Sequence, residues 1–135
     1  MCKKKTTFRF KVHYHQVDQM GIVHHAQYLY FLEQSRIQWL ENFGIRYAAL
    51  ERKGVLLPVV SLSIDYKQPL HFDDTFLCHI SLDDFKGSVV CFSYRIEDEN
   101  GSLYSTAKTT LVFVNAKTRK AMKCPKELLA IFSAE

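Results

Sequence analysis

Most residues that could do chemistry lie in one stretch, HYHQVDQMGIVHHAQYLYF, which runs from His13 to Phe31 and holds four histidines, one acid and one glycine. The histidines suggest a metal site, because His13 and His15 point the same way if they lie on a strand. However, no acid or cysteine at ligand spacing completes the set, and the adjacent His24 and His25 cannot both face one ion comfortably. The stretch therefore favours chemistry without a bound metal.

The acid of this stretch, Asp18, has a structural and a catalytic interpretation. Aspartate at the first position and glycine at the fourth position of the segment DQMG are typical of a type I turn. Between Gly21 and Tyr28 there is no Ser, Thr, Asp or Asn to cap the following helix, so its first N–H groups lack a local side-chain partner. Such donors suit an oxygen that gains negative charge during attack on an acyl carbonyl, and a nearby carboxylate could act on that carbonyl or on a water. Water or a histidine could equally satisfy the helix end while Asp18 only pins the loop, so the residues alone leave both interpretations open.

The elements that position this stretch follow from the spacing of apolar residues. Residues 7–15 alternate, with Phe8, Phe10, Val12 and Tyr14 on one face, which predicts a half-buried strand. From Gln27 to Phe43 the apolar residues recur at three- and four-residue steps, which predicts a long helix buried on most sides. Gly44 is expected to end this helix as its C′ residue.

After a short irregular region, the remainder is predicted to form strands and one short helix. A two-residue turn at Lys86-Gly87 would place Cys78 opposite Arg95 and Cys91 opposite Leu82, so these thiols would not meet. The pair Asn100-Gly101 is typical of a type I′ hairpin turn, and Pro125 fits the first turn of a terminal helix. The expected ranges are Val59–Tyr66, Thr75–Leu82, Val90–Ile96 and Leu103–Val114 for strands and Lys126–Phe132 for the helix. The fold class is therefore α+β, a largely antiparallel sheet around one helix with a face left for a partner subunit.

Length and charge restrict the function further. A chain of 135 residues fits one globular domain, and it contains neither a signal peptide nor an apolar run long enough to span a membrane, so we expect a cytoplasmic protein. The net charge of +4 comes from both ends, Lys3 to Lys5 and the cluster that contains Lys117, Arg119 and Lys120. These clusters are either solvated surface or a site for a phosphorylated small molecule. A nucleic-acid partner is disfavoured, because no aromatic residue is interleaved with either cluster.

The segment DQMGIVHHAQYLYFLEQSR resembles the motif of hotdog-fold acyl-CoA thioesterases of the YbgC and 4-hydroxybenzoyl-CoA thioesterase type. The resemblance rests on Asp18, Gly21, Val23, His25, Tyr28, Phe31, Glu33, Ser35 and Arg36, and it extends weakly through VSLSIDYKQPLHFDD. It implies a single hotdog domain over residues 1–135, a curved antiparallel sheet around one central helix. The sequence departs from the family motif at His24, where an aromatic residue is more usual, and at Gln16-Val17, which replace an acid and a threonine.

The resemblance also implies roles for individual residues. Asp18 would be the nucleophile or the general base, and the backbone N–H of His25 would polarise the thioester carbonyl, while the His25 side chain orients Asp18 or the substrate. Gly21 and Val23 would bind the substrate, and Tyr28 would line the acyl pocket or pack in the core. Glu33 lies where some hotdog thioesterases place their acid, but an ion pair with Arg36 is the commoner explanation of that spacing.

The function implied is hydrolysis of a short- to medium-chain or aromatic acyl-CoA to the free acid and coenzyme A, with no metal and no organic cofactor. Lys117, Arg119 and Lys120 would contact the phosphates of coenzyme A. The resemblance further implies a homo-oligomer, a dimer or a dimer of dimers (a homotetramer). The alternative is a non-catalytic protein that binds acyl-CoA or acyl carrier protein, or a scaffold in peripheral contact with lipid-synthesis enzymes.

Overall fold

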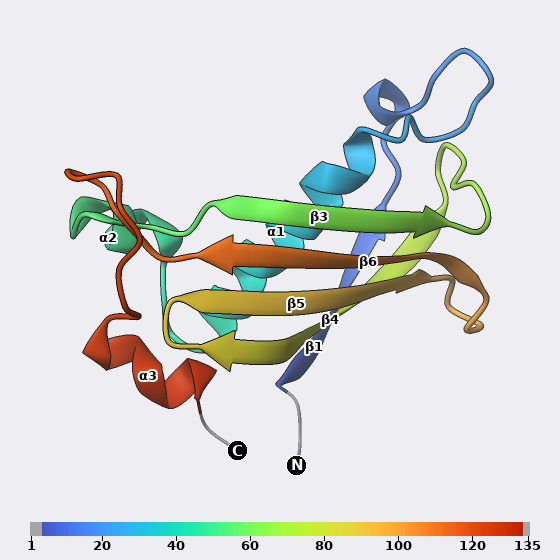
Figure 1. Ribbon diagram of the computed structural model, residues 1–135. Helices are drawn as coiled ribbons and strands as arrows, with labels where there is room; N and C mark the ends of the chain where they lie inside the picture. Colours follow the sequence, from blue (N-terminus) through green and yellow to red (C-terminus); the bar gives the residue numbers. More distant parts are fainter. Residues whose placement is uncertain (1–3, 134–135) are drawn as a thin grey trace.

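The computed structural model describes residues 4–133, so the sequence expectations that concern Cys2 and Lys3 lie outside the described residues. A five-stranded antiparallel sheet curves around one long helix (Figure 1), with the strand order β1-β4-β5-β6-β3. The strands of this sheet are β1 (Lys5–Lys11), β3 (Val59–Tyr66), β4 (Thr75–Lys86), β5 (Val89–Glu97) and β6 (Leu103–Val112). The predicted α+β class, an antiparallel sheet around a single long helix, is confirmed.

The long helix α1 (Gln27–Asn42) crosses the inner face of the sheet. Its buried residues include Phe31 and Trp39, and the Trp39 ring packs edge-on against Phe92 of β5 at 5.1 Å between ring centroids. The helix ends as predicted at Gly44, which has a φ of +82° and donates its N–H to Glu41, while the N–H of Ile45 bonds to Leu40. The expectation that most sides are buried is wrong at the N-terminal half, because Leu29 and Tyr30 are exposed on a face that nothing in the described chain covers.

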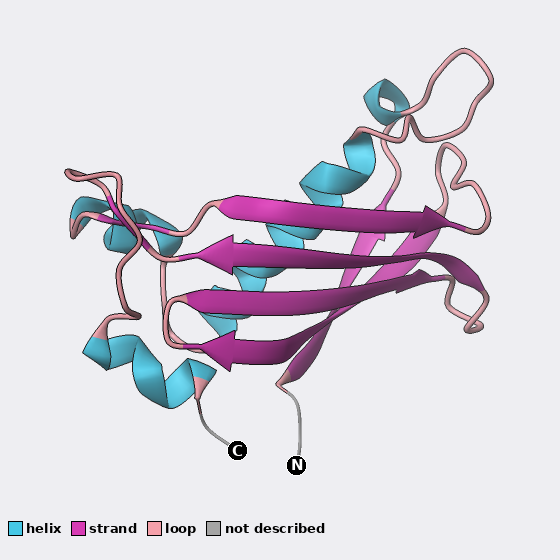
Figure 2. Cartoon of the chain, viewed as in Figure 1, coloured by secondary structure: helices cyan, strands magenta, loops and turns pink. Residues whose placement is uncertain are grey.

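Smaller elements close one end of the sheet (Figure 2). Helix α2 (Tyr47–Arg52) and a two-stranded ribbon of β2 (Val55–Leu56) and β7 (Val114–Asn115) lie at one end, followed by helix α3 (Lys126–Phe132). The region expected to be irregular before β3 thus contains a helix and a short strand. The predicted terminal helix is confirmed, with Pro125 at its N-cap.

The first strand is shorter than predicted. It ends at Lys11, and the chain then turns into the 3-10 helix η1 (Tyr14–Gln16) instead of continuing to His15. This turn leaves Tyr14 75% exposed, so the prediction that it shares the buried face of Phe10 and Val12 is wrong. Tyr14 continues the alternation of apolar residues in the sequence without lying on the strand. Its ring packs on the exposed Phe72 in a loop instead of in the core.

Both hairpins form, but with turns that differ from the predicted ones. Lys86 pairs with Val89, which places the first turn at Gly87 and Ser88, and a bulge at Asp83 shifts the register again. Cys78 therefore lies opposite Ile96 and Cys91 opposite Asp84; both thiols are free, as is Cys124.

The second turn begins at Asp98, whose carbonyl accepts the N–H of Gly101 and whose carboxylate accepts the N–H groups of Asn100 and Ser102. Among its residues only Gly101 has a positive φ, so the type I′ prediction is wrong. The Asp98 carboxylate stabilises this wider loop in place of the tighter turn.

The edge strand β3 is the least covered part of the sheet. Its predicted apolar face carries Val60, Leu62, Ile64 and Tyr66, of which Ile64 alone is partly buried while the other three are exposed. The strand pairs with β6 on one side, and its other edge carries no partner among residues 4–133. No helix in that range is long and apolar enough to cross a membrane.

Candidate active site

Asp18 is held in a tight turn before α1. The N–H of Gly21 donates to the Asp18 carbonyl at 3.0 Å, and Gly21 has a φ of +80°, which a residue with a side chain rarely adopts. One carboxylate oxygen, Oδ1, accepts the N–H of Met20 at 2.8 Å and that of Ile22 at 3.4 Å. The other oxygen, Oδ2, has no hydrogen-bond partner among the described residues. The loop therefore fixes the direction of the exposed carboxylate while it leaves one oxygen free to react.

The first backbone N–H groups of α1 have hydrogen-bond partners that the sequence did not predict. No side chain caps it, as predicted, but the backbone satisfies its first donors in tight turns: Gln27 donates to His24, Tyr28 to His25 and Leu29 to Ala26. The expectation that these first helical donors are free is therefore wrong. The free donor in this part of the described chain is the N–H of His25, which lies two residues before the helix. This is the amide that the resemblance names as the group polarising the carbonyl.

Asp18 and His25, which carry the free carboxylate oxygen and the free amide, both line a cavity of about 390 Å³. Of the predicted site residues, Asp18, Val23, His25 and Tyr28 line it, whereas Gly21 holds the loop from outside it. The complete lining is Asp18, Ile22, Val23, His25, Tyr28, Tyr66, Lys67, Gln68 and Pro69. The arrangement suits attack on a carbonyl whose oxygen points at the His25 amide.

Tyr28 and Tyr66 form the aromatic wall of this cavity. Their rings meet edge to face at 5.0 Å between centroids, and the Tyr66 hydroxyl donates to the His25 carbonyl at 3.2 Å. Burial raises the pKa of both phenols, so both hydroxyls stay protonated near neutral pH. Tyr28 is 2% exposed, so it packs in the core as one of its expected roles requires, and it also lines the cavity; its contact with an acyl group stays a prediction.

The last residue of β3 and the segment that follows it also line the cavity, although none of these residues was individually predicted to belong to the site. Tyr66 ends β3, and Lys67 and Gln68 follow it at the cavity wall. The signal for them was present, because they belong to VSLSIDYKQPLHFDD, the second segment with a family resemblance. Antiparallel strand signals alone could not show that the end of β3 returns to the Asp18 loop.

The histidines form stacked pairs at this end of the molecule. The His13 and His15 rings lie 5.8 Å apart, and those of His24 and His25 lie 4.3 Å apart, with His24 Nδ1 accepting the N–H of Ala26 at 3.2 Å. Within residues 4–133 no three His, Cys, Asp or Glu side chains converge in a way that could hold a metal ion.

The basic cluster lies at the other end of the sheet. Lys117, Arg119 and Lys120 are exposed on the turn after β7, which the Asn115 side chain stabilises by accepting the N–H groups of Lys117 and Thr118. Figure 1 shows this turn beside α2, across the length of the sheet from the Asp18 loop. Within one subunit the structure therefore does not bring the predicted phosphate-binding residues to Asp18.

The predicted ion pair of Glu33 with Arg36 is absent from the described chain. Arg36 instead points inward and donates to the Tyr94 hydroxyl at 3.2 Å, while Glu33 stays exposed. The Arg36 guanidinium is thus used in the interior, where it supports a buried phenol. Glu33 does not line the Asp18 cavity of its own subunit.

Comparisons with known proteins agree with this architecture. The model of the Thioesterase-like superfamily matches residues 12–132. The chain is 36% identical to "Putative acyl-CoA thioesterase YneP" of Bacillus subtilis, over 86% of this chain and 84% of that protein, and 29% identical to "Acyl-CoA thioesterase YbgC" of Haemophilus influenzae, over 93% of each. Among solved structures, the hypothetical protein TT1821 from Thermus thermophilus superposes with a TM-score of 0.88 at 31% identity, covering 94% of this chain and 96% of that one. The chain therefore belongs to the thioesterase-like superfamily and is a hotdog-fold member of the YbgC type.

Proposed function

We propose that the protein hydrolyses acyl-CoA thioesters to the free acid and coenzyme A. The observation that carries this proposal is a single cavity lined by both Asp18, whose Oδ2 has no hydrogen-bond partner among the described residues, and His25, whose backbone N–H has none there either. The relatives named acyl-CoA thioesterases support the same reaction. Short- to medium-chain and aromatic acyl groups are the proposed substrates.

The proposed mechanism uses the carboxylate and the amide in one step. Asp18 either attacks the thioester carbon or removes a proton from the attacking water, and the His25 N–H stabilises the oxygen that becomes negative. The C–S bond then breaks, and coenzyme A leaves as a thiolate, which accepts a proton. If Asp18 attacks directly, a water hydrolyses the resulting anhydride in a second step. Tyr66 fixes the His25 carbonyl and therefore the geometry of the turn that carries the amide.

We further propose that the active unit is a dimer formed by pairing the β3 edges of two copies. Val60, Leu62 and Tyr66 are 60%, 41% and 49% exposed on this strand, and an apolar, unpaired edge is a liability unless another strand covers it. A two-fold axis through β3 makes the pairing antiparallel and would continue the sheet through both subunits. Two such dimers would give the expected dimer of dimers.

The same two-fold axis would place the basic cluster of one subunit near the active site of the other. It would bring the α2 end of one subunit, where Lys117, Arg119 and Lys120 lie, beside the Asp18 loop of the other. These exposed cations would then contact the phosphates of the coenzyme A that is bound at the partner's Asp18. Contacts of this kind at the surface weaken as the salt concentration rises.

The direct test is the Asp18→Asn variant. The amide keeps the size of the side chain and can still accept a hydrogen bond from Met20, but it is neither a nucleophile nor a base at neutral pH. We expect free-thiol release from a panel of acyl-CoAs to fall by about a hundredfold or more. Wild-type turnover in this variant would exclude Asp18 from the chemistry.

A matched control separates loss of chemistry from loss of the loop. Asp98 makes a closely similar side-chain turn in the β5–β6 hairpin, where Oδ1 accepts two backbone N–H groups, but it lines no part of the Asp18 cavity. Asp98→Asn should therefore affect stability to a similar degree and leave turnover unchanged. Equal losses of activity in both variants would mean that the effect comes from folding.

A further inference from the structure

The side chain of His24 lies beside the amide that the proposed mechanism uses, although it has no part in that mechanism. Its Nδ1 accepts the N–H of Ala26 at 3.2 Å, and its ring stacks on the ring of His25 with 4.3 Å between the centroids. A phenyl ring at this position could stack in the same way, but it could not accept the N–H. The hydrogen bond to Ala26 therefore depends on the imidazole.

The hydrogen bonds around His24 hold the turn that carries the His25 amide. The N–H of His24 donates to the Gln16 carbonyl at 3.0 Å, and the His24 carbonyl accepts the N–H of Gln27 at 2.8 Å. Because the imidazole accepts the N–H of Ala26, the donors on both sides of His25 have partners within the protein. The His25 N–H is thus the free donor of a turn whose other donors are fixed.

Only the neutral imidazole of His24 can make this contact. A nitrogen that accepts an N–H carries no proton, so the His24 ring is the neutral tautomer with its proton on Nε2. In the charged form both ring nitrogens are donors, and Nδ1–H would then point at the N–H of Ala26. The ring would have to turn away from Ala26, and it would lose its stacking on His25.

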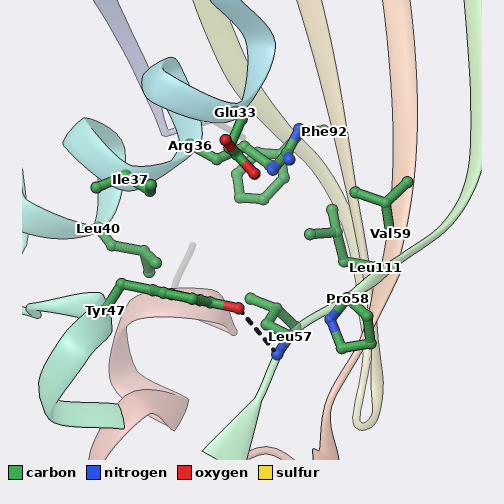
Figure 3. Close-up of a pocket in the computed structure, with 10 residues that line it drawn as sticks. All are labelled: Glu33, Arg36, Ile37, Leu40, Tyr47, Leu57, Pro58, Val59, Phe92 and Leu111. Atoms are coloured by element: carbon green, nitrogen blue, oxygen red, sulfur yellow. Dashed lines mark hydrogen bonds between the residues drawn. The ribbon is translucent and has the colours of Figure 1, made fainter. Parts of the chain in front are cut away.

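The titratable groups around His24 differ in the pH range in which such groups change charge. His25 stacks on it, His15 precedes its contact Gln16 in η1, and Asp18 and Lys67 line the cavity beside His25. Two phenols also line that cavity, and burial raises the pKa of both. No histidine lines the cavity at the opposite end of β3 (Figure 3). Carboxylic acids ordinarily titrate near pH 4 and ammonium groups near pH 10, so a change between about pH 5 and 8 indicates an imidazole.

We propose that His24 is a positioning residue for the His25 amide and that only its neutral form serves in this role. A proton on the ring breaks the hydrogen bond to Ala26, releases the stacked pair and lets the oxyanion donor move. This inference rests on the proposed hydrolysis at Asp18. The consequence is a fall of kcat in the pH range of imidazole titration, with little change in KM, because the amide acts on the transition state.

Two substitutions separate the hydrogen bond of His24 from its ring. His24→Asn places an amide oxygen at the same number of bonds from the backbone as Nδ1, so it can accept the N–H of Ala26 without titrating. His24→Phe keeps a ring that stacks on His25 but accepts no hydrogen bond. His15→Phe is the matched control, since His15 is also exposed in a stacked pair, with His13, and its side chain makes no hydrogen bond among the described residues.

The pH dependence of thiol release from one acyl-CoA tests the inference, with circular dichroism at each pH to verify that the protein is folded. In the wild type and in His15→Phe, kcat should fall about fivefold or more between pH 8 and pH 5.5. His24→Asn should keep kcat within about twofold of the wild type at pH 8 and lose most of this fall. His24→Phe should lower kcat about two- to tenfold at pH 8, the effect of one hydrogen bond, and should also lose most of the fall.

The opposite results would overturn the inference and leave hydrolysis at Asp18 standing. They are a wild-type kcat that does not change between pH 8 and pH 5.5, or a wild-type acid limb that persists in both His24 variants. An active Asp18→Asn variant would instead overturn the proposed function.

Nitrogen NMR of the His24 ring tests the same contact without catalysis. We expect the Nε2–H tautomer at pH 8 and an Ala26 amide resonance that shifts together with the titration of the ring. An Nδ1–H tautomer, or an Ala26 amide that does not respond to the protonation of His24, would refute the positioning role.

Discussion

Neutralising the basic turn after β7 should weaken substrate binding without slowing the chemistry. Lys117, Arg119 and Lys120 are exposed and have no acidic partner within 4 Å among the described residues, so their charges are available to a phosphate. The triple glutamine variant removes the three charges and keeps polar, although shorter, side chains. Position 119 has a φ of +62°, which is unfavourable for any residue with a side chain, so replacing arginine by glutamine leaves this backbone strain unchanged.

The size of the effect follows from the exposure of the three cations. An exposed ion pair contributes about 0.2 to 1 kcal/mol, so three contacts together give roughly 0.6 to 3 kcal/mol. This corresponds to an increase in KM of about 3- to 150-fold at low salt. The turnover number kcat should stay near the wild-type value, because no residue of this turn lines the Asp18 cavity.

Free-thiol release at several salt concentrations measures this effect. The wild-type KM should rise with salt, and the KM of the triple variant should be nearly independent of it. A control triple variant at Arg9, Lys86 and Lys108, all exposed, changes the net charge by the same amount. An equal rise in KM for the control would show that overall charge attracts the substrate, and the basic turn would then have no specific role.

Three further predictions concern the wall of the site, the edge strand and the outer face of the sheet. Tyr66→Phe removes the donor to the His25 carbonyl and should lower kcat about fivefold with little change in KM, measured by thiol release; an unchanged kcat would contradict a positioning role. Leu62→Asp places a charge on the apolar edge of β3 and should yield inactive monomers, measured by light scattering and thiol release, whereas an active dimer would exclude this interface. The hydrogen bond from Arg95 lowers the pKa of Glu97, so this carboxylate stabilises the fold above its unfolded pKa and the stabilisation is lost as the pH falls through the lower folded pKa. Glu97→Gln should therefore reduce the acid dependence of the free energy of unfolding below about pH 4.5, and an unaltered acid limb would refute this.

The main elements could be predicted from the sequence because their local signals agree with the tertiary structure. The apolar spacing from Gln27 onward and Gly44 at position C′ define α1 within one residue, and strand alternation identifies every strand of the main sheet. Turn details are less predictable, since they depend on hydrogen bonds that compete at similar energies. In the second hairpin the Asp98 carboxylate outweighs the preference of Asn100-Gly101, and in the first hairpin a bulge at Asp83 changes the register.

The candidate site was predicted only in part, since it combines local and distant segments. Asp18, Gly21 and His25 lie within eight residues, so their motif can be recognised as a unit. The contribution of Tyr66 depends on where the edge strand ends in space, and periodicity gives no information about that. The free amide at His25 could not be found by searching for missing caps, because the backbone of residues 24–29 satisfies the neighbouring donors through its own turns.

The strand β3 shows why a correct pattern can lead to a wrong statement about burial. Its alternation of apolar residues is real, and in an isolated chain it predicts a face buried in the core. In the structure that face is exposed at Val60, Leu62 and Tyr66, although β4 and β5 with the same kind of pattern are fully buried on their apolar side. The difference is that α1 meets this edge strand through the ring contact of Tyr28 with Tyr66, while Val60 and Leu62 stay exposed. Because apolar residues on an exposed edge strand favour association, the pattern of β3 is better explained by burial between two subunits than by burial within one.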